Sequence, residues 1–173
     1  MAAALTGWLT APYGVRWEST VTADEQAKAF VPDEFDVPRE LTTPQFRLEP
    51  LGPEHNEEDY EAWTSSIEHI RATPGFSIGR WPVPGMTPEE NLADLRRHAH
   101  DFAQRSGFTY TVLDAGSGRV IGCVYIYPSR EHVGVTDVRS WVRADRADLD
   151  PVLREAVSAW LTTRWPFERV AYA

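Results

Sequence analysis

Two histidines in the middle of the chain are the first side chains whose type and spacing suggest chemistry, because imidazole is a common metal ligand. His98 and His100 cannot hold one ion together, since residues two apart on a helix point about 200° away from each other. Asp94 and His98 are four residues apart and have the better spacing. A zinc site needs a third protein ligand, and none stands at a suitable spacing, so we expect no metal site.

Cys123 is the only cysteine, and a nucleophilic thiol would need a basic neighbour and an electropositive, partly exposed setting. Its neighbours Ile121, Val124 and Ile126 are apolar, which favours a buried, inert thiol. A single cysteine cannot form a disulfide within the chain, and this suits a reducing compartment. Since the first residues do not resemble a secretory leader, we expect a cytoplasmic protein.

Local catalytic signatures are absent from the sequence. It contains no Gly-x-Ser-x-Gly nucleophile elbow, no phosphate-binding P-loop and no dinucleotide fingerprint. Candidate residues must therefore be judged by the elements that position them.

The spacing of apolar residues predicts a sheet with three helices. The clearest helix begins at Thr87, where a threonine N-cap, Pro88 in the first turn and Glu90 form a capping box. Aromatic and β-branched residues on either side of Gly116 and Gly118 predict a hairpin. We predict strands over 46–51, 108–114, 120–127, 135–143 and 169–172, and helices over 54–71, 88–107 and 148–164.

Residues 1–45 differ from the rest of the chain and read as an extended arm, while 46–173 form one folded domain. Alternating residues over 15–21 predict one strand in the arm. A capping box opens a short helix from Thr22 toward Phe30, and prolines favour an extended path over 31–44.

The order of these elements, the run Phe46–Leu51 that opens it and the run Gly122–Tyr127 in the hairpin resemble the GCN5-related N-acetyltransferase (GNAT) family. The likeness is to its ribosomal-alanine and antibiotic-acetylating branches and covers about residues 46–173. It implies an α/β (α+β) fold with a mixed, mainly antiparallel central sheet and helices on both faces. It also implies transfer of an acetyl group from acetyl-CoA to an amine by direct attack, without a covalent intermediate.

The resemblance also implies where acetyl-CoA binds. In the family the fourth strand separates from the fifth, the pantetheine lies in the opening, and the pyrophosphate rests on backbone amides at the start of the following helix. The side chains of Arg143 and Arg146 would neutralise the phosphates. The cofactor-binding residues implied in this sequence are Trp141, Val142, Arg143, Arg146, Ala147, Asp148, Leu149 and Val152.

Two features depart from the family pattern. The phosphate-binding loop normally carries Arg/Gln-x-x-Gly-x-Gly/Ala, whereas Arg143–Val152 contains no glycine and carries three aspartates. A like charge within about 4 Å of a phosphate costs roughly 1 kcal/mol in water and several in a partly dry site. The family also continues past the last strand with a helix and two strands, and here the chain ends at Ala173. We expect the arm or a second subunit to cover that edge.

The resemblance places the amine acceptor near the end of the first helix. Glu68, or as second choice His69, would take a proton from the ammonium group if its pKa lay near neutrality. The strands set Tyr125, Tyr127 and Arg139 where they would line an acceptor groove. The alternative remains open that the rings pack against the early helices and that the charged groups face water.

Composition excludes several classes of partner. A formal charge of −9 argues against nucleic acid, because it would repel a phosphate backbone. The chain has no run of about 18 apolar residues, so we expect no membrane-spanning helix. All but one of the 17 basic residues are arginine, which we interpret as codon preference in a GC-rich, bacterial genome. Seven tryptophans and an open sheet edge make a homodimer a fair expectation.

Two functional hypotheses follow. The first is an N-acetyltransferase that uses acetyl-CoA and a small-molecule or peptide amine acceptor. The second is a non-catalytic GNAT-like module for binding or interaction that has lost coenzyme A, and the glycine-free loop motivates it. We prefer the first because most of the family is catalytic.

Overall fold

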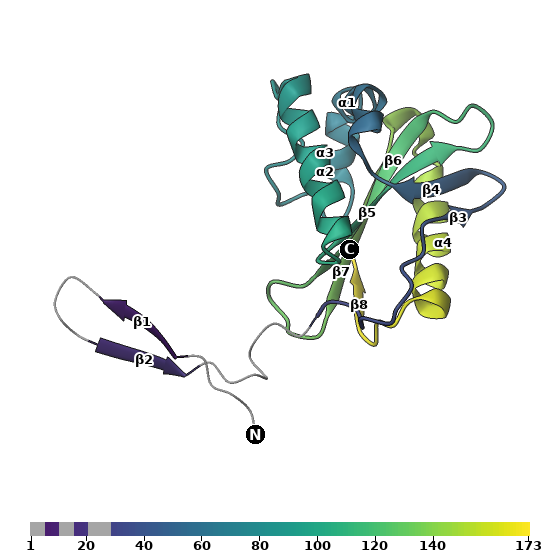
Figure 1. Cartoon of the computed structure of the whole chain (residues 1–173). Coiled ribbons are helices and arrows are strands. Elements are labelled where there is room, and N and C mark those ends of the chain that lie inside the picture. Colours follow the sequence, from purple (N-terminus) through teal and green to yellow (C-terminus); the bar gives the residue numbers. More distant parts are fainter. Residues whose placement is uncertain (1–5, 11–15, 21–28) are drawn as a thin grey trace.

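A computed structural model describes residues 6–10, 16–20 and 29–173 of the chain. Six strands of this part form one sheet in the order β3-β4-β5-β6-β7-β8 (Figure 1). All neighbouring pairs are antiparallel except β7 and β8, which run parallel. The strands are β3 (Leu41–Thr42), β4 (Phe46–Pro50), β5 (Phe108–Asp114), β6 (Val120–Pro128), β7 (Thr136–Val142) and β8 (Val170–Tyr172).

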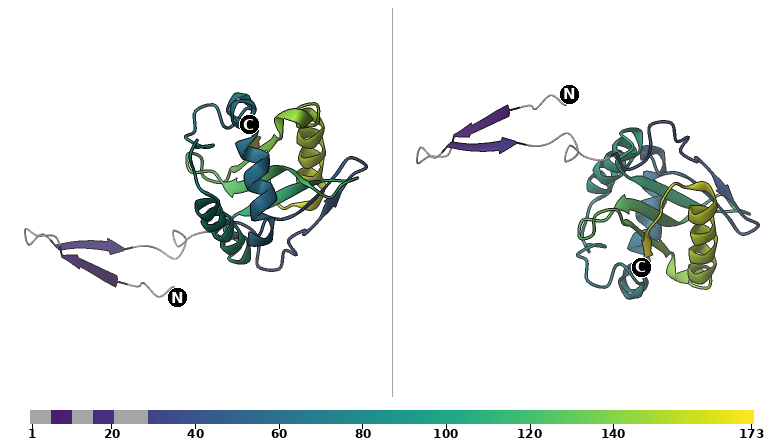
Figure 2. Two further views of the ribbon diagram at one scale, coloured as in Figure 1. Left: turned by 90° about the horizontal axis from the view of Figure 1, so that it is seen from above. Right: turned by 90° about the horizontal axis from the view of Figure 1, so that it is seen from below.

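Helices cover both faces of this sheet (Figure 2). Three of them, α1 (Asn56–Thr64), α2 (Ile67–Ala72) and α3 (Pro88–Ala103), lie on one face, and α4 (Leu149–Arg164) lies on the other. The predicted mixed, mainly antiparallel sheet with helices on both faces is therefore confirmed. In the described part, the helices are too short or too polar to cross a membrane.

The two faces of β7 point into two separate cores. Val138 and Val142 pack toward α4, whose apolar residues recur every four positions and so form one stripe. Trp141, between them on the strand, points to the other face and packs with the α1 to α3 side. Cys123 lies in that second core and is fully buried, which raises the pKa of its thiol. The predicted burial of this thiol is therefore confirmed.

The start of α3 has the predicted capping box. The Thr87 hydroxyl accepts from the Glu90 backbone N–H at 3.2 Å, and the Glu90 carboxylate accepts from the Thr87 N–H at 2.7 Å. The helix ends at Ala103, earlier than predicted, because Arg105 adopts a left-handed conformation with φ of 59°.

The single helix predicted over 54–71 is wrong in one respect, because the chain breaks it into a 3-10 turn (Pro53–His55), α1 and α2. The break falls at Ser66, whose φ is −133°. The buried Ser66 hydroxyl accepts from the backbone N–H of Ala144 at 2.8 Å. A contact with a residue far along the chain therefore fixes the break, and local periodicity does not reveal it.

The arm is described in part. The predicted strand over 15–21 corresponds to β2 (Arg16–Thr20), which pairs antiparallel with β1 (Thr6–Thr10), a strand that was not predicted. The predicted helix from Thr22 toward Phe30 falls mainly outside the described residues.

The extended path predicted over 31–44 is interrupted. The Phe35 N–H donates to the Pro32 carbonyl at 3.0 Å in a turn, and Leu41–Thr42 form β3, but residues 31–40 pack on the domain. Val31 is 1% exposed and lies in the α4-side core. Arg105 donates to the backbone carbonyls of Pro32 and Phe35 at 2.7 and 2.9 Å. The following strand β3 pairs with β4, so the described part of the arm covers the sheet edge opposite β8.

Candidate functional site

The parallel strands β7 and β8 separate after a short pairing. They pair from Thr136 to Val138, and the backbone N–H of Ala173 donates to the Val138 carbonyl at 2.9 Å. Beyond this point β7 continues to Val142 beside a cleft of about 120 Å³. The cleft is lined by Thr73, Pro74, Ser140, Asp150, Pro151, Arg154, Tyr172 and Ala173.

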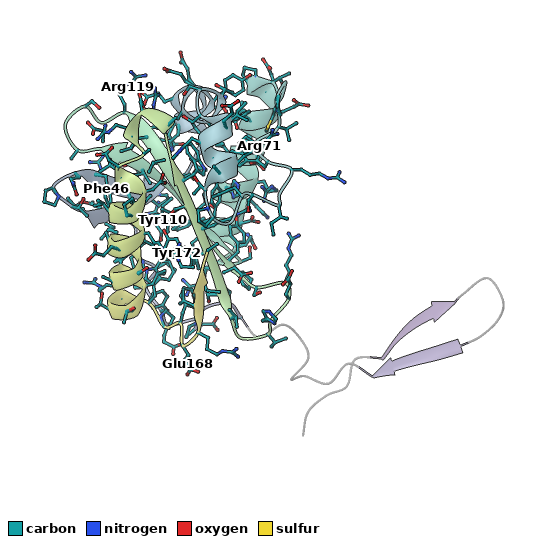
Figure 3. The ribbon with its side chains drawn as sticks, turned by 180° about the vertical axis from the view of Figure 1, so that it is seen from behind. Phe46, Arg71, Tyr110, Arg119, Glu168 and Tyr172 are labelled. Carbon is teal, nitrogen blue, oxygen red and sulfur yellow. The ribbon has the colours of Figure 1, made fainter. Side chains whose placement is uncertain are left out.

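Tyr172 of β8 stands in this cleft (Figure 3). Its hydroxyl lies 2.6 Å from the Ser140 hydroxyl on β7. The guanidinium of Arg154 on α4 covers the ring at 4.7 Å from its centroid. Burial raises the pKa of Tyr172 to about 12, so its hydroxyl keeps its proton at neutral pH.

A contact between an imidazole and a carboxylate lies beside the cleft, at the start of α4. Nε2 of His69 on α2 lies 2.7 Å from Oδ2 of Asp150 on α4. Burial raises the pKa of the Asp150 carboxyl, although His69 and the backbone amide of Val142 stabilise its charged form. The pair therefore ties α2 to α4 across one end of the cleft.

A second, larger pocket of about 380 Å³ lies where α1 ends, beside the short 3-10 turn Ala144–Arg146 that precedes α4. It is lined by residues 64–69 and by Ala144. Glu68 is exposed here and does not line the cleft between β7 and β8. Both predicted proton acceptors therefore line this second pocket, and His69 also contacts Asp150, a residue of the cleft.

Arginines near the start of α4 are already paired with carboxylates. Nε of Arg143 lies 3.1 Å from Asp145, and Nη1 lies 3.8 Å from Glu61. Nη2 of Arg146 lies 2.8 Å from Asp114, the last residue of β5. The backbone N–H of Ser117 and the Arg146 guanidinium hold the pKa of Asp114 at about 2. Both arginines therefore already have carboxylate partners, and Asp145 is the one partner that belongs to the loop itself.

Solved structures of known proteins share this arrangement, although no protein-family model and no curated protein matches the sequence. The ribosomal-protein-S5-alanine acetyltransferase from Vibrio fischeri superposes with a TM-score of 0.62 at 14% identity, over 79% of this chain and 73% of that one. The chain has the GNAT fold.

Two similar structures contain the cofactor. A ribosomal L7/L12 alpha-N-protein acetyltransferase in complex with coenzyme A has a TM-score of 0.59 at 9% identity, over 76% of this chain and 72% of that one. The Microcin C7 self immunity acetyltransferase in complex with acetyl-CoA and AMP has a TM-score of 0.55 at 10% identity, over 69% and 62%. At these identities the likeness extends to the fold alone.

In this GNAT fold, the residues implied for the cofactor lie along the end of β7 and the start of α4. The side chains of Trp141, Val142 and Leu149 are buried and belong to the cores. Ala147 and Asp148 are exposed at the turn before α4. The remaining members of the set are the paired Arg143 and Arg146 and the half-buried Val152. Any contact from the buried members would therefore have to come from their backbone.

The predicted acceptor residues divide into two groups. Tyr125 and Arg139 face each other across β6 and β7, with the guanidinium carbon 5.2 Å from the ring centroid. Tyr127 instead hydrogen-bonds with His98 at 2.8 Å and donates to Asp101 at 2.9 Å. Only Tyr125 and Arg139 are brought together, and Tyr127 belongs to a contact network with α3.

Three residues of the site were missed or misread in the sequence. Tyr172 could have been recognised from its place on the strand next to β7, had the parallel register been known. Asp150 was interpreted only as a repulsive charge, because its partner His69 is 81 residues away. Phe76 stacks under Arg139 from a loop that carries no periodic signal.

Proposed function

We propose that the protein is an N-acetyltransferase that transfers an acetyl group from acetyl-CoA to an amine by direct attack. The observation that carries the proposal is the cleft where β7 and β8 separate, next to the start of α4. Two structures with the same fold are complexes with coenzyme A or acetyl-CoA. The bound cofactor would supply the activated acetyl group.

The backbone around the cleft fits such a ligand better than the side chains do. The edge of β7 beyond Val138 is not paired with β8, and strand edges and helix starts offer amide donors. The Asp150 carboxylate puts a negative charge at the same place. A bound pyrophosphate would therefore meet a repulsive charge beside the helix start.

Two side chains at the cleft could move protons. We assign proton acceptance to His69 ahead of Glu68, because a carboxylate partner fixes its ring at the end of the cleft. The Tyr172 hydroxyl, which stays protonated at neutral pH, is the proton donor that the cleft offers. The acceptor would be a small amine or the amino terminus of a peptide, in the cytoplasm.

Thermal unfolding with and without ligand tests the proposal. Acetyl-CoA at about 100 times its Kd should stabilise the protein by roughly 2.7 kcal/mol, which is a shift of about 5 to 11 °C at this size. Free coenzyme A should act similarly, and AMP, which lacks the pantetheine, should have less effect. No shift at millimolar acetyl-CoA would remove the proposal.

A second candidate function is a binding module without catalysis. It is favoured by the carboxylate partners of Arg143 and Arg146, because in the described structure neither guanidinium is left free for a phosphate. Asp150 likewise already contacts His69. Absence of coenzyme A binding in the melting experiment would support this candidate.

A further inference from the structure

The guanidinium of Arg139 on β7 lies over two aromatic rings. Its guanidinium carbon lies 4.9 Å from the centroid of Phe76 and 5.2 Å from that of Tyr125. Phe76 is 1% exposed, and Tyr125 is fixed because its hydroxyl accepts from Nε1 of Trp141 at 3.1 Å. The rings that support the guanidinium are therefore themselves rigid.

The loop after α2 presses on the same side chain. The carbonyl of Gly75 accepts from Nη1 of Arg139 at 3.4 Å. Gly75 has φ of +91°, and a Cβ there would lie 3.0 Å from Cβ of Arg139 and 2.9 Å from Cβ of Ala173. Only glycine fits this approach without strain. Thr73 and Pro74 of this loop line the cleft, as does Ser140, the neighbour of Arg139 on β7. Arg139 itself points to the opposite face of the strand, toward Phe76 and Tyr125.

Arg139 has donors to spare. Within residues 29–173, no carboxylate lies within ion-pair distance of its guanidinium, in contrast to Arg143 and Arg146. A guanidinium carries five N–H donors in one plane, and a contact with ring faces uses none of them. The Gly75 carbonyl takes one, and the side chain is exposed.

We propose that Arg139 binds a carboxylate of the acceptor, so that the substrates of this site are amines that also carry a carboxylate. The inference rests on the proposed function and names its substrate class. A guanidinium already fixed in orientation loses little freedom when it forms two parallel hydrogen bonds to a carboxylate. The carboxylate could belong to a free amino acid or to an acidic side chain of a peptide, and the chemistry is the same.

NMR titration of the full chain tests the inference without cofactor. The readouts are the Nε–H signal of Arg139 and the amide signal of Gly75. The first probe pair is glycine and glycinamide, and the second is a tetrapeptide amide with aspartate or asparagine at its second position. We expect at least about tenfold tighter binding of the carboxylate member in one pair, since hydrogen bonds between two charged groups are stronger than neutral ones. The responsive pair distinguishes a free amino acid from a peptide.

Variants separate recognition from packing. Arg139→Gln should abolish the preference for the carboxylate, and Arg139→Lys should retain part of it. Arg130→Gln, which removes an exposed arginine from the turn after β6, should leave the preference unchanged. Equal affinity within both pairs, a preference that persists in Arg139→Gln, or no saturable shift at tens of millimolar would overturn the inference.

The two experiments can fail separately, so failure of this inference is distinguishable from failure of the proposed function. If acetyl-CoA stabilises the protein but the carboxylates do not bind, the acetyltransferase proposal stands and this inference fails. If the carboxylates bind through Arg139 but acetyl-CoA does not, the proposed function fails and the site is that of a binding module.

Discussion

A buried carboxylate on α1 shows how single residues set the pH response. Oδ2 of Asp59 accepts from Nδ2 of Asn91 at 3.0 Å, and Oδ1 of Asn91 accepts from Nε1 of Trp63 at 3.0 Å. Asp59 is only 4% exposed, and this burial raises its pKa from 3.8 to about 6, although Asn91 and His98 stabilise the charge.

The raised pKa predicts a loss of stability with rising pH. Between about pH 4 and 6 the folded state binds a proton that the unfolded state has released, so this contribution is full below pH 4 and is lost as pH rises through 6. The free energy of unfolding of Asp59→Asn, relative to wild type, should therefore rise by on the order of 3 kcal/mol between pH 4 and pH 8.

Urea unfolding of wild type and Asp59→Asn from pH 4 to 8 measures this difference. Asp94 and Asp114, whose pKa values lie near 2, act below pH 4 and cancel in the comparison. Asp137→Asn, an exposed residue on β7, is the matched control and should follow wild type. Parallel profiles for Asp59→Asn and wild type would contradict the prediction.

At the scale of elements, the contact between α2 and α4 controls the cleft. Asp150 is the charged residue that would meet a cofactor phosphate, and its pair with His69 spans the two helices. Asp150→Asn removes the charge with little change of shape. We expect its Kd for coenzyme A to fall about fivefold, because one like charge at about 4 Å costs roughly 1 kcal/mol in water.

Isothermal titration calorimetry with coenzyme A gives that Kd directly. Asp137→Asn removes one negative charge elsewhere on β7 and controls for the change in net charge. Unchanged or weaker binding by Asp150→Asn alone would mean that the carboxylate does not oppose the ligand.

Arg105, just after α3, holds residues 31–40 of the arm, here called the strap, against the domain. Arg105→Gln removes the guanidinium that holds the carbonyls of Pro32 and Phe35. We expect a loss of about 1 to 3 kcal/mol, the usual value for hydrogen bonds to charged groups, and faster hydrogen exchange at the Phe35 amide. Arg47→Gln, which breaks an exposed pair with Glu49, should change stability by less than about 0.5 kcal/mol. Slow exchange at Phe35 in Arg105→Gln would show that packing alone holds the strap.

At the scale of the whole molecule, the outer edge of β8 is open. In the described part of the chain, β8 pairs only with β7, and the arm adds its strand at the far edge of the sheet. Of the seven tryptophans that suggested a dimer, four lie in the cores, so the open edge is the argument that remains.

We therefore predict a dimer that forms through β8. Light scattering at tens of micromolar should give twice the chain mass, and Val170→Lys, at a residue 40% exposed on the edge, should give a monomer. Val83→Lys changes a valine of similar exposure, 44%, in the loop between α2 and α3, outside the sheet, and should leave the dimer intact. A wild-type monomer would remove the prediction.

The sequence by itself determined the elements that local periodicity and capping define. The aromatic and β-branched residues over 108–114 and 120–127 and the capping box at Thr87 each predict their element, because those signals depend only on nearby residues. The element order was then enough to recognise the GNAT fold.

Tertiary structure decided the site. The break at Ser66 depends on Ala144, the pair of His69 depends on Asp150, and the rings beneath Arg139 come partly from a loop before α3. Each contact joins residues more than 60 apart, with no shared period. Such contacts form only when hydrophobic packing of both sheet faces brings distant segments together, and so the chemistry of the cleft could not be read from the chain alone.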